Sequence, residues 1–153
     1  MLPRRIGAGG MRSGPADKIM VLNRMAAQRV RLAGRLLYKQ RVAPQSSRHL
    51  QLLEKQLKGL SEVQVWLEAV LNKTRSLVEE GGRILDANMK RGDYDLPSLS
   101  RDFTLIRKLG RQEEIVRMIG PQLQEVNAMI VLLNNKRNSI IDSIYRKIIK
   151  KLP

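Results

Sequence analysis

The side chains that usually carry catalysis or bind metal ions are scarce in this sequence. The 153 residues include no cysteine and a single histidine, His49. Without cysteine there is no thiol catalysis, disulfide or zinc thiolate site, and one histidine excludes a metal site built from several. No nucleophile, base and orienting residue combine into a catalytic set. We therefore expect no enzyme activity, and neither a cofactor nor a metal ion.

The acidic residues offer no catalytic pair either. Glu79 and Glu80 are adjacent, as are Glu113 and Glu114. Adjacent residues on a helix do not face each other, so neither pair forms an acid–base dyad. The glycine-rich stretch over residues 7–10 follows no strand, as a nucleotide-binding fingerprint would require. These motifs predict solvated helix faces and a loop.

Basic residues are the remaining chemical signal. The net charge is +15, from 29 lysines and arginines against 14 acidic residues. Residues 1–50 hold 11 basic residues and one acidic residue, and therefore two-thirds of the net charge. Such asymmetry favours an acidic partner such as a microtubule, a nucleic acid or an anionic lipid surface. The predicted polyanion-binding residues are Arg4, Arg5, Arg12, Arg24, Arg31 and Arg35.

The elements that must position these residues are predicted to be helices. Aromatic residues make up only 3% of the chain, so the core must consist of Leu, Ile, Val and Met, which suits helix packing. Apolar residues recur at spacings of three and four, and no strand pattern appears. We expect a disordered basic arm over 1–15 and a single helical domain over 16–153. Its predicted helices are 16–42, 48–91 with a possible break at 81–82, 99–119, and 121–150.

Glycine and proline set the expected boundaries of these helices. Gly81 and Gly82 each cost about 1 kcal/mol inside a helix, which favours a kink, a hinge or a break there. Ser98 or Ser100 is the expected N-cap of the third helix. Gly120–Pro121 is expected to be a kink or a restart, at which glycine closes one helix and proline opens the next. The chain turn lies over 92–97. The fold class is therefore all-α, as an extended helical hairpin or a three-to-four-helix bundle with coiled-coil character.

Leucines in a heptad repeat indicate a coiled-coil seam in the second helix. Seams of this length usually need partner helices, so other helical protein subunits are the expected partners. We also expect 48–91 to pack antiparallel to 121–150. The predicted partner-interface residues are Leu50, Leu53, Leu57, Leu60, Trp66, Leu67, Leu123, Val126, Ile130 and Leu133.

These features predict a non-enzymatic coiled-coil subunit of a larger assembly, of the cytoskeletal, kinetochore or organelle-trafficking type, with a basic N-terminal docking surface. The alternative is a basic helical protein that binds nucleic acid or a ribonucleoprotein. A second alternative is a mitochondrial helical protein, because the N-terminus resembles a transit peptide in composition. The longest uncharged stretch, Val126–Asn135, is half the length of a transmembrane helix, which needs about 20 residues. We expect no transmembrane segment and a cytoplasmic or nuclear location.

Overall fold

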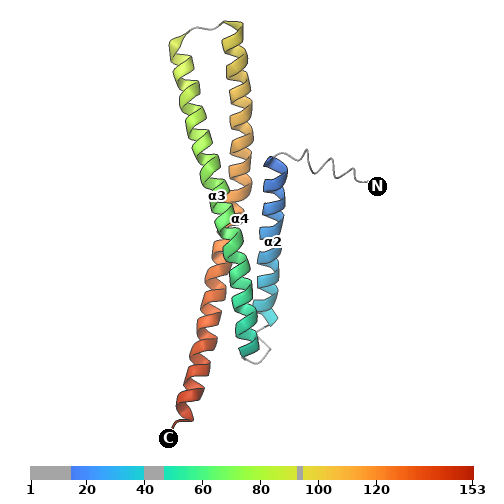
Figure 1. The fold of residues 1–153 in the computed structure, drawn as a ribbon, viewed down its shortest axis with the longest axis vertical. Helices are drawn as coiled ribbons and strands as arrows, with labels where there is room; N and C mark the ends of the chain where they lie inside the picture. The colour runs from blue at the N-terminus through green and yellow to red at the C-terminus, as the bar shows by residue number, and fades with distance from the viewer. Residues whose placement is uncertain (1–14, 40–46, 93–94) are drawn as a thin grey trace, which may run out of the picture. The chain divides into compact units, whose positions relative to one another are not determined.

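The computed structural model describes residues 15–39, 47–92 and 95–153, which form three long helices (Figure 1). They are α2 (Pro15–Lys39), α3 (Ser47–Arg91) and α4 (Leu96–Lys150). No strand occurs within these ranges, and the predicted all-α fold class is confirmed. The predicted basic arm falls almost entirely outside the described residues.

The chain divides into two compact units. The hairpin unit comprises Met1–Val21 and Leu67–Pro121, and the bundle unit comprises Leu22–Trp66 and Gln122–Pro153. In the hairpin unit, α3 and α4 run antiparallel on either side of the turn near Gly92, which has a φ of 71°. In the bundle unit, portions of all three helices pack together. The predicted hairpin or bundle architecture is therefore present.

The core of the hairpin unit is small. Leu67, Leu71 and Ile119 are buried, together with Thr74, whose Oγ1 donates a hydrogen bond to the Val70 carbonyl at 2.7 Å. The predicted packing of 48–91 against 121–150 is confirmed for the residues up to Trp66, whereas residues 67–91 pack antiparallel to the 96–121 portion of α4 instead. Residues 122–150 pack against the earlier half of α3, in the bundle unit.

The predicted break at Gly81–Gly82 is wrong, because α3 is continuous through both residues. The reason is tertiary packing. Gly81 is buried against Leu109 of α4, and a Cβ at this position would lie 3.2 Å from Leu109 Cγ. Glycine thus lets the two helices approach closely, and this packing offsets the low helix propensity of the residue.

Of the two outcomes predicted at Gly120–Pro121, a kink or a restart, the restart is wrong, because α4 runs through Pro121 as one helix of 55 residues. Ile119 and Leu123, on either side of Pro121, are buried. Their packing stabilises the helix there, although proline lacks the N–H donor of a helical hydrogen bond. The helix also starts before the expected serine caps. Asp95 is the N-cap, since its Oδ1 accepts a hydrogen bond of 2.8 Å from the Ser98 N–H.

The bundle unit contains the larger core. Small residues bring its helices close together: Ala26 and Ala33 of α2 are fully buried, and Gly34 lies against Met129 of α4. Gln64 of α3 donates a 2.6 Å hydrogen bond from Nε2 to Asn127 Oδ1 of α4. The larger buried side chains of this unit are Leu53, Leu57, Leu60, Val63, Leu123, Val126, Leu133 and Ile140.

Candidate docking surfaces

The three predicted arginines of α2 share one exposed side of the helix. Arg24, Arg31 and Arg35 are exposed, whereas Ala26 and Ala33 on the opposite side are buried in the bundle unit. Sequence spacings of seven and four account for this common side. Arg117 and Glu113 form an ion pair at 3.7 Å, whereas Arg24, Arg31 and Arg35 form no ion pair with a carboxylate of the described residues. Arg4, Arg5 and Arg12 lie outside the described residues.

A fourth arginine of α2 has a different environment. Arg29 is half-buried, and its guanidinium group lies against Gly59 of α3. Glycine leaves room there for the arginine side chain, so Arg29 lies over the interface between α2 and α3 rather than extending the basic surface. The basic α2 surface therefore consists of Arg24, Arg31 and Arg35.

The predicted partner-interface residues lie mostly inside this chain. Only Trp66 is well exposed, with 47% of its surface accessible, while Leu50 and Ile130 are half-buried. The other members pack against neighbouring helices within the hairpin unit or the bundle unit. The buried members are Leu53, Leu57, Leu60, Leu67, Leu123, Val126 and Leu133.

An apolar groove that the sequence did not predict lies on the hairpin unit. It runs between α3 and α4, has a volume of about 190 Å³, and contains four apolar side chains between polar rims. Leu77 and Ile84 are 36% and 47% exposed, although each is a large aliphatic residue. The sequence held one signal of this surface. Leu77 and Ile84 are seven residues apart, and they lie outside the heptad positions of the predicted coiled-coil seam. The groove is lined by Leu77, Glu80, Gly81, Ile84, Leu105, Lys108, Leu109 and Gln112.

Further apolar side chains of the hairpin unit are exposed on α4. Leu96, Phe103 and Ile106 are among them, and their side chains are 82%, 60% and 48% exposed. Only the first residues of α2, 15–21, join the two helices in this unit. A two-helix hairpin has little capacity to bury apolar surface without a third layer, so this exposed apolar surface is a candidate docking surface.

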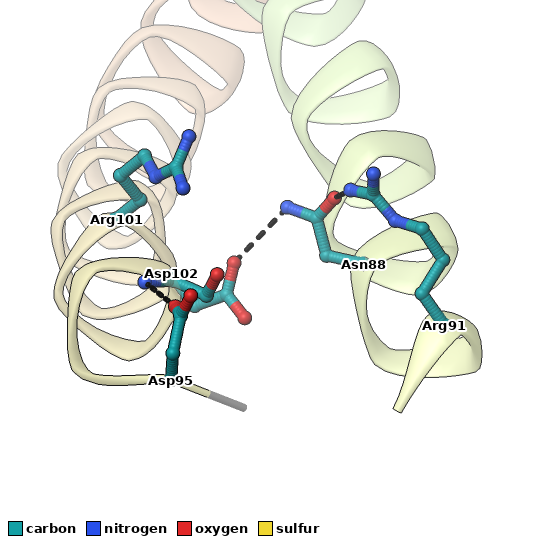
Figure 2. A pocket seen from close by; sticks show the side chains of 6 residues that line it. Asn88, Arg91, Asp95, Arg101 and Asp102 are labelled. Atoms are coloured by element: carbon teal, nitrogen blue, oxygen red, sulfur yellow. Dashed lines mark hydrogen bonds between the residues drawn. The ribbon is translucent and has the colours of Figure 1, made fainter. Parts of the chain in front are cut away.

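A polar pocket of about 270 Å³ lies beside the turn of the hairpin unit (Figure 2). Asp102 is almost buried and accepts a 3.0 Å hydrogen bond from Asn88 Nδ2, while Arg91 donates to Asn88 Oδ1. The hydrogen bonds that the Ser98 hydroxyl and N–H donate to Asp95 lower the pKa of this carboxyl below its usual value of 3.8. Arg101 donates to the Pro97 carbonyl.

This pocket therefore joins the two helix ends rather than assembling reactive groups. Each carboxylate accepts a hydrogen bond from an amide, a hydroxyl or a backbone N–H, and each arginine donates to a neutral oxygen. The Ser98 hydroxyl, which belongs to this lining, is engaged in the hydrogen bond to Asp95 at the start of α4. Its lining offers hydrogen bonds that hold α3 and α4 in register at the turn.

In the described residues, no three histidine, aspartate or glutamate side chains gather closely enough to hold a metal ion. None of the three described helices contains an apolar stretch long enough to cross a membrane. Comparison of the chain with protein-family models, with curated proteins and with solved structures found no match. The function of the chain must therefore be inferred from the surfaces of its two units.

Proposed function

We propose that this chain is a non-enzymatic helical subunit of a larger protein assembly, and that its hairpin unit binds a helix of a partner subunit. The observation that carries the proposal is the apolar groove between α3 and α4, where Leu77 and Ile84 remain exposed. Burying a fully exposed aliphatic side chain of this size contributes about 1.5–3 kcal/mol, and the 36% and 47% of Leu77 and Ile84 that remain exposed would contribute a corresponding fraction each. A partner that covers both residues therefore gains substantial binding free energy.

The bundle unit indicates why the partner element is a helix. There, α3 and α4 bury a third helix, α2, through residues such as Ala26 and Ala33. The hairpin unit is built from the same two helices but includes only residues 15–21 of α2. An amphipathic helix that places apolar residues into the groove would supply the missing layer, with Glu80 and Lys108 available to its polar flanks.

The basic α2 surface supports a second contact in the same assembly. Arg24, Arg31 and Arg35 are exposed together and form no ion pair with an acidic side chain of the described residues. An acidic protein surface, such as a microtubule lattice, is complementary to them. Assemblies of the cytoskeletal, kinetochore or organelle-trafficking type offer both contacts.

Site-specific photo-crosslinking tests the helix-in-groove proposal. A photoreactive amino acid at Ile84 should crosslink in cells to a helical segment of one protein that co-purifies in a defined complex. The matched control position is Asp86, which is exposed on the other side of α3. Because Asp86 is directed away from the groove, it should not give that adduct.

The variant Ile84→Asp provides the functional arm of the same experiment. A carboxylate placed in the groove would have to be desolvated on binding, so the complex should dissociate while the chain stays folded. The proposal is contradicted if native mass measurements find only the monomer in cells, or if Ile84→Asp leaves the complex intact. Co-purification of RNA or DNA in place of a protein would favour the nucleic-acid alternative.

A further inference from the structure

The last turns of α4 carry an apolar row that no described residue covers. Ile141, Tyr145 and Ile148 are 42%, 63% and 54% exposed, and their neighbours Ile149 and Leu152 are exposed too. Every residue from 145 to 153 is exposed. These turns belong to the bundle unit, and they extend past the start of α3 (Figure 1).

Basic side chains occupy the opposite side of the same turns. With about 100° of rotation per residue, Ile141, Tyr145, Ile148 and Ile149 fall within one arc of about 100°. Arg146, Lys147 and Lys150 fall within a second arc of similar width on the far side, and all three are exposed. Residues 141–153 contain four basic residues and a single acidic residue, Asp142.

We propose that residues 141–152, the C-terminal amphipathic segment, bind the surface of an anionic lipid bilayer with the helix lying in the plane of the interface. A helix with a broad apolar face and a lysine- and arginine-rich polar face is typical of interfacial binding. An anionic bilayer matches both arcs, because its acyl chains offer apolar contact to the first arc and its headgroups offer negative charge to the second. Tyr145 combines an aromatic ring with a hydroxyl, which suits the headgroup region.

The segment would lie on the bilayer and not cross it. None of the described helices is long and apolar enough to cross a membrane. The five exposed apolar side chains would supply the hydrophobic part of the binding free energy. Arg146, Lys147 and Lys150 would supply the electrostatic part, which is sensitive to salt. The segment shares no residue with the hairpin groove, so membrane binding and the proposed function can fail independently.

Co-sedimentation of the full chain with lipid vesicles tests the proposal. The vesicles contain either phosphatidylcholine alone or phosphatidylcholine and phosphatidylserine in equal parts, at low and high salt. We expect binding to the anionic vesicles that weakens at high salt, and little binding to phosphatidylcholine alone. Replacing Arg146, Lys147 and Lys150 with Gln should weaken the anionic binding without changing the helical content.

The variant Ile148→Asp isolates the apolar contribution, and Val131→Asp is its matched control. The two positions are 54% and 57% exposed on the same helix, so neither substitution disturbs the core. Ile148→Asp should reduce vesicle binding about tenfold or more, because it removes an apolar side chain from the bilayer and adds a repelled charge. Val131→Asp should leave binding within about twofold of the parent chain, a difference well below the contribution of one apolar side chain.

Three results would overturn the membrane proposal. The first is no binding to anionic vesicles at low salt, and the second is equal binding by the Ile148→Asp variant and the parent chain. The third is a dimer in sedimentation equilibrium that Ile148→Asp dissociates, in the absence of vesicle binding. That third result would assign the apolar row to a second copy of this chain.

Discussion

At the scale of single residues, Arg137 contains a buried polar atom that has no hydrogen-bond partner in the described chain. Its side chain is half-buried in the bundle unit, and its Nε is buried without a hydrogen-bond partner in the described chain. An unsatisfied buried donor destabilises the folded state, whereas an apolar stem of similar length does not. Arg137→Met should therefore raise the free energy of unfolding by about 1 kcal/mol.

Urea denaturation measures this change, with Arg146→Met as the control. Arg146 is exposed on the same helix, so its replacement should change the free energy of unfolding by less than about 0.5 kcal/mol. If Arg137→Met is less stable than the parent chain, the guanidinium group makes a contact that stabilises the folded state by more than the unpaired Nε destabilises it.

Asp95 links the stability of the hairpin unit to pH. Its carboxyl pKa is lower in the folded chain than in the unfolded chain, because Ser98 donates hydrogen bonds to it. The carboxylate therefore stabilises the folded state above the unfolded pKa of 3.8, and this contribution disappears as the pH falls through the folded pKa. Asp95→Ala should lower the melting temperature at neutral pH, and the difference from the parent chain should shrink towards about pH 2.

Thermal melts at neutral and acidic pH check this expectation, with Asp95→Asn as the control that retains an N-capping oxygen. Asn should melt closer to the parent chain than Ala at neutral pH. A melting-temperature difference between Asp95→Ala and the parent chain that is constant across the pH range would mean that the carboxylate charge plays no part.

At the scale of the helix, Gly81 and Gly82 are neighbours with different surroundings. A Cβ at Gly82 would meet no atom within 4 Å, so Gly82→Ala should stabilise α3 by about 0.5–1 kcal/mol through helix propensity. A Cβ at Gly81 would overlap the Leu109 side chain, which must move to accommodate it. Gly81→Ala should therefore gain less than Gly82→Ala, or lose stability.

Chemical denaturation of the two single variants provides this comparison, because both make the same chemical change one residue apart. Equal gains would show that Leu109 repacks freely and that the close approach of the helices at Gly81 is not required. A loss of stability at Gly82 would show that the helix needs a glycine there for a reason other than packing.

The helix boundaries mark where sequence reasoning succeeded and where it failed. Apolar spacing located all three described helices, since periodicity reflects the face that each helix buries. The expected breaks at Gly81–Gly82 and Gly120–Pro121 did not occur, because local propensity was offset by contacts distant in sequence, such as Gly81 with Leu109. Ser98 was a candidate cap, yet Asp95 takes that role and Ser98 donates to it.

Of the candidate surfaces too, one could be predicted from the sequence and one could not. The common exposed side of Arg24, Arg31 and Arg35 follows from helical spacing alone, and the structure places them so. The apolar groove could not be predicted, because it depends on which residues of α3 and α4 pair across the hairpin. Leu77 and Ile84 become visible as a surface only when the register of that pairing is known.

At the scale of the whole molecule, the net charge of +15 predicts salt-sensitive binding to polyanions. A DNA duplex serves as a probe of known charge density, whichever polyanion the cell provides. Replacing Arg24, Arg31 and Arg35 with Ala lowers the net charge from +15 to +12, since each change removes one positive charge. If all three bind phosphates, the slope of log affinity against log salt should become shallower by about 0.9 for each arginine replaced.

The matched control removes the same charge elsewhere. Arg83, Arg107 and Arg111 are exposed on the hairpin unit, so their replacement with Ala also gives +12 without touching the basic α2 surface. Fluorescence anisotropy at several salt concentrations should show a larger decrease in affinity and in slope for the α2 variant. Equal decreases would mean that the whole charge of the molecule attracts the polyanion, and that Arg24, Arg31 and Arg35 form no docking surface of their own.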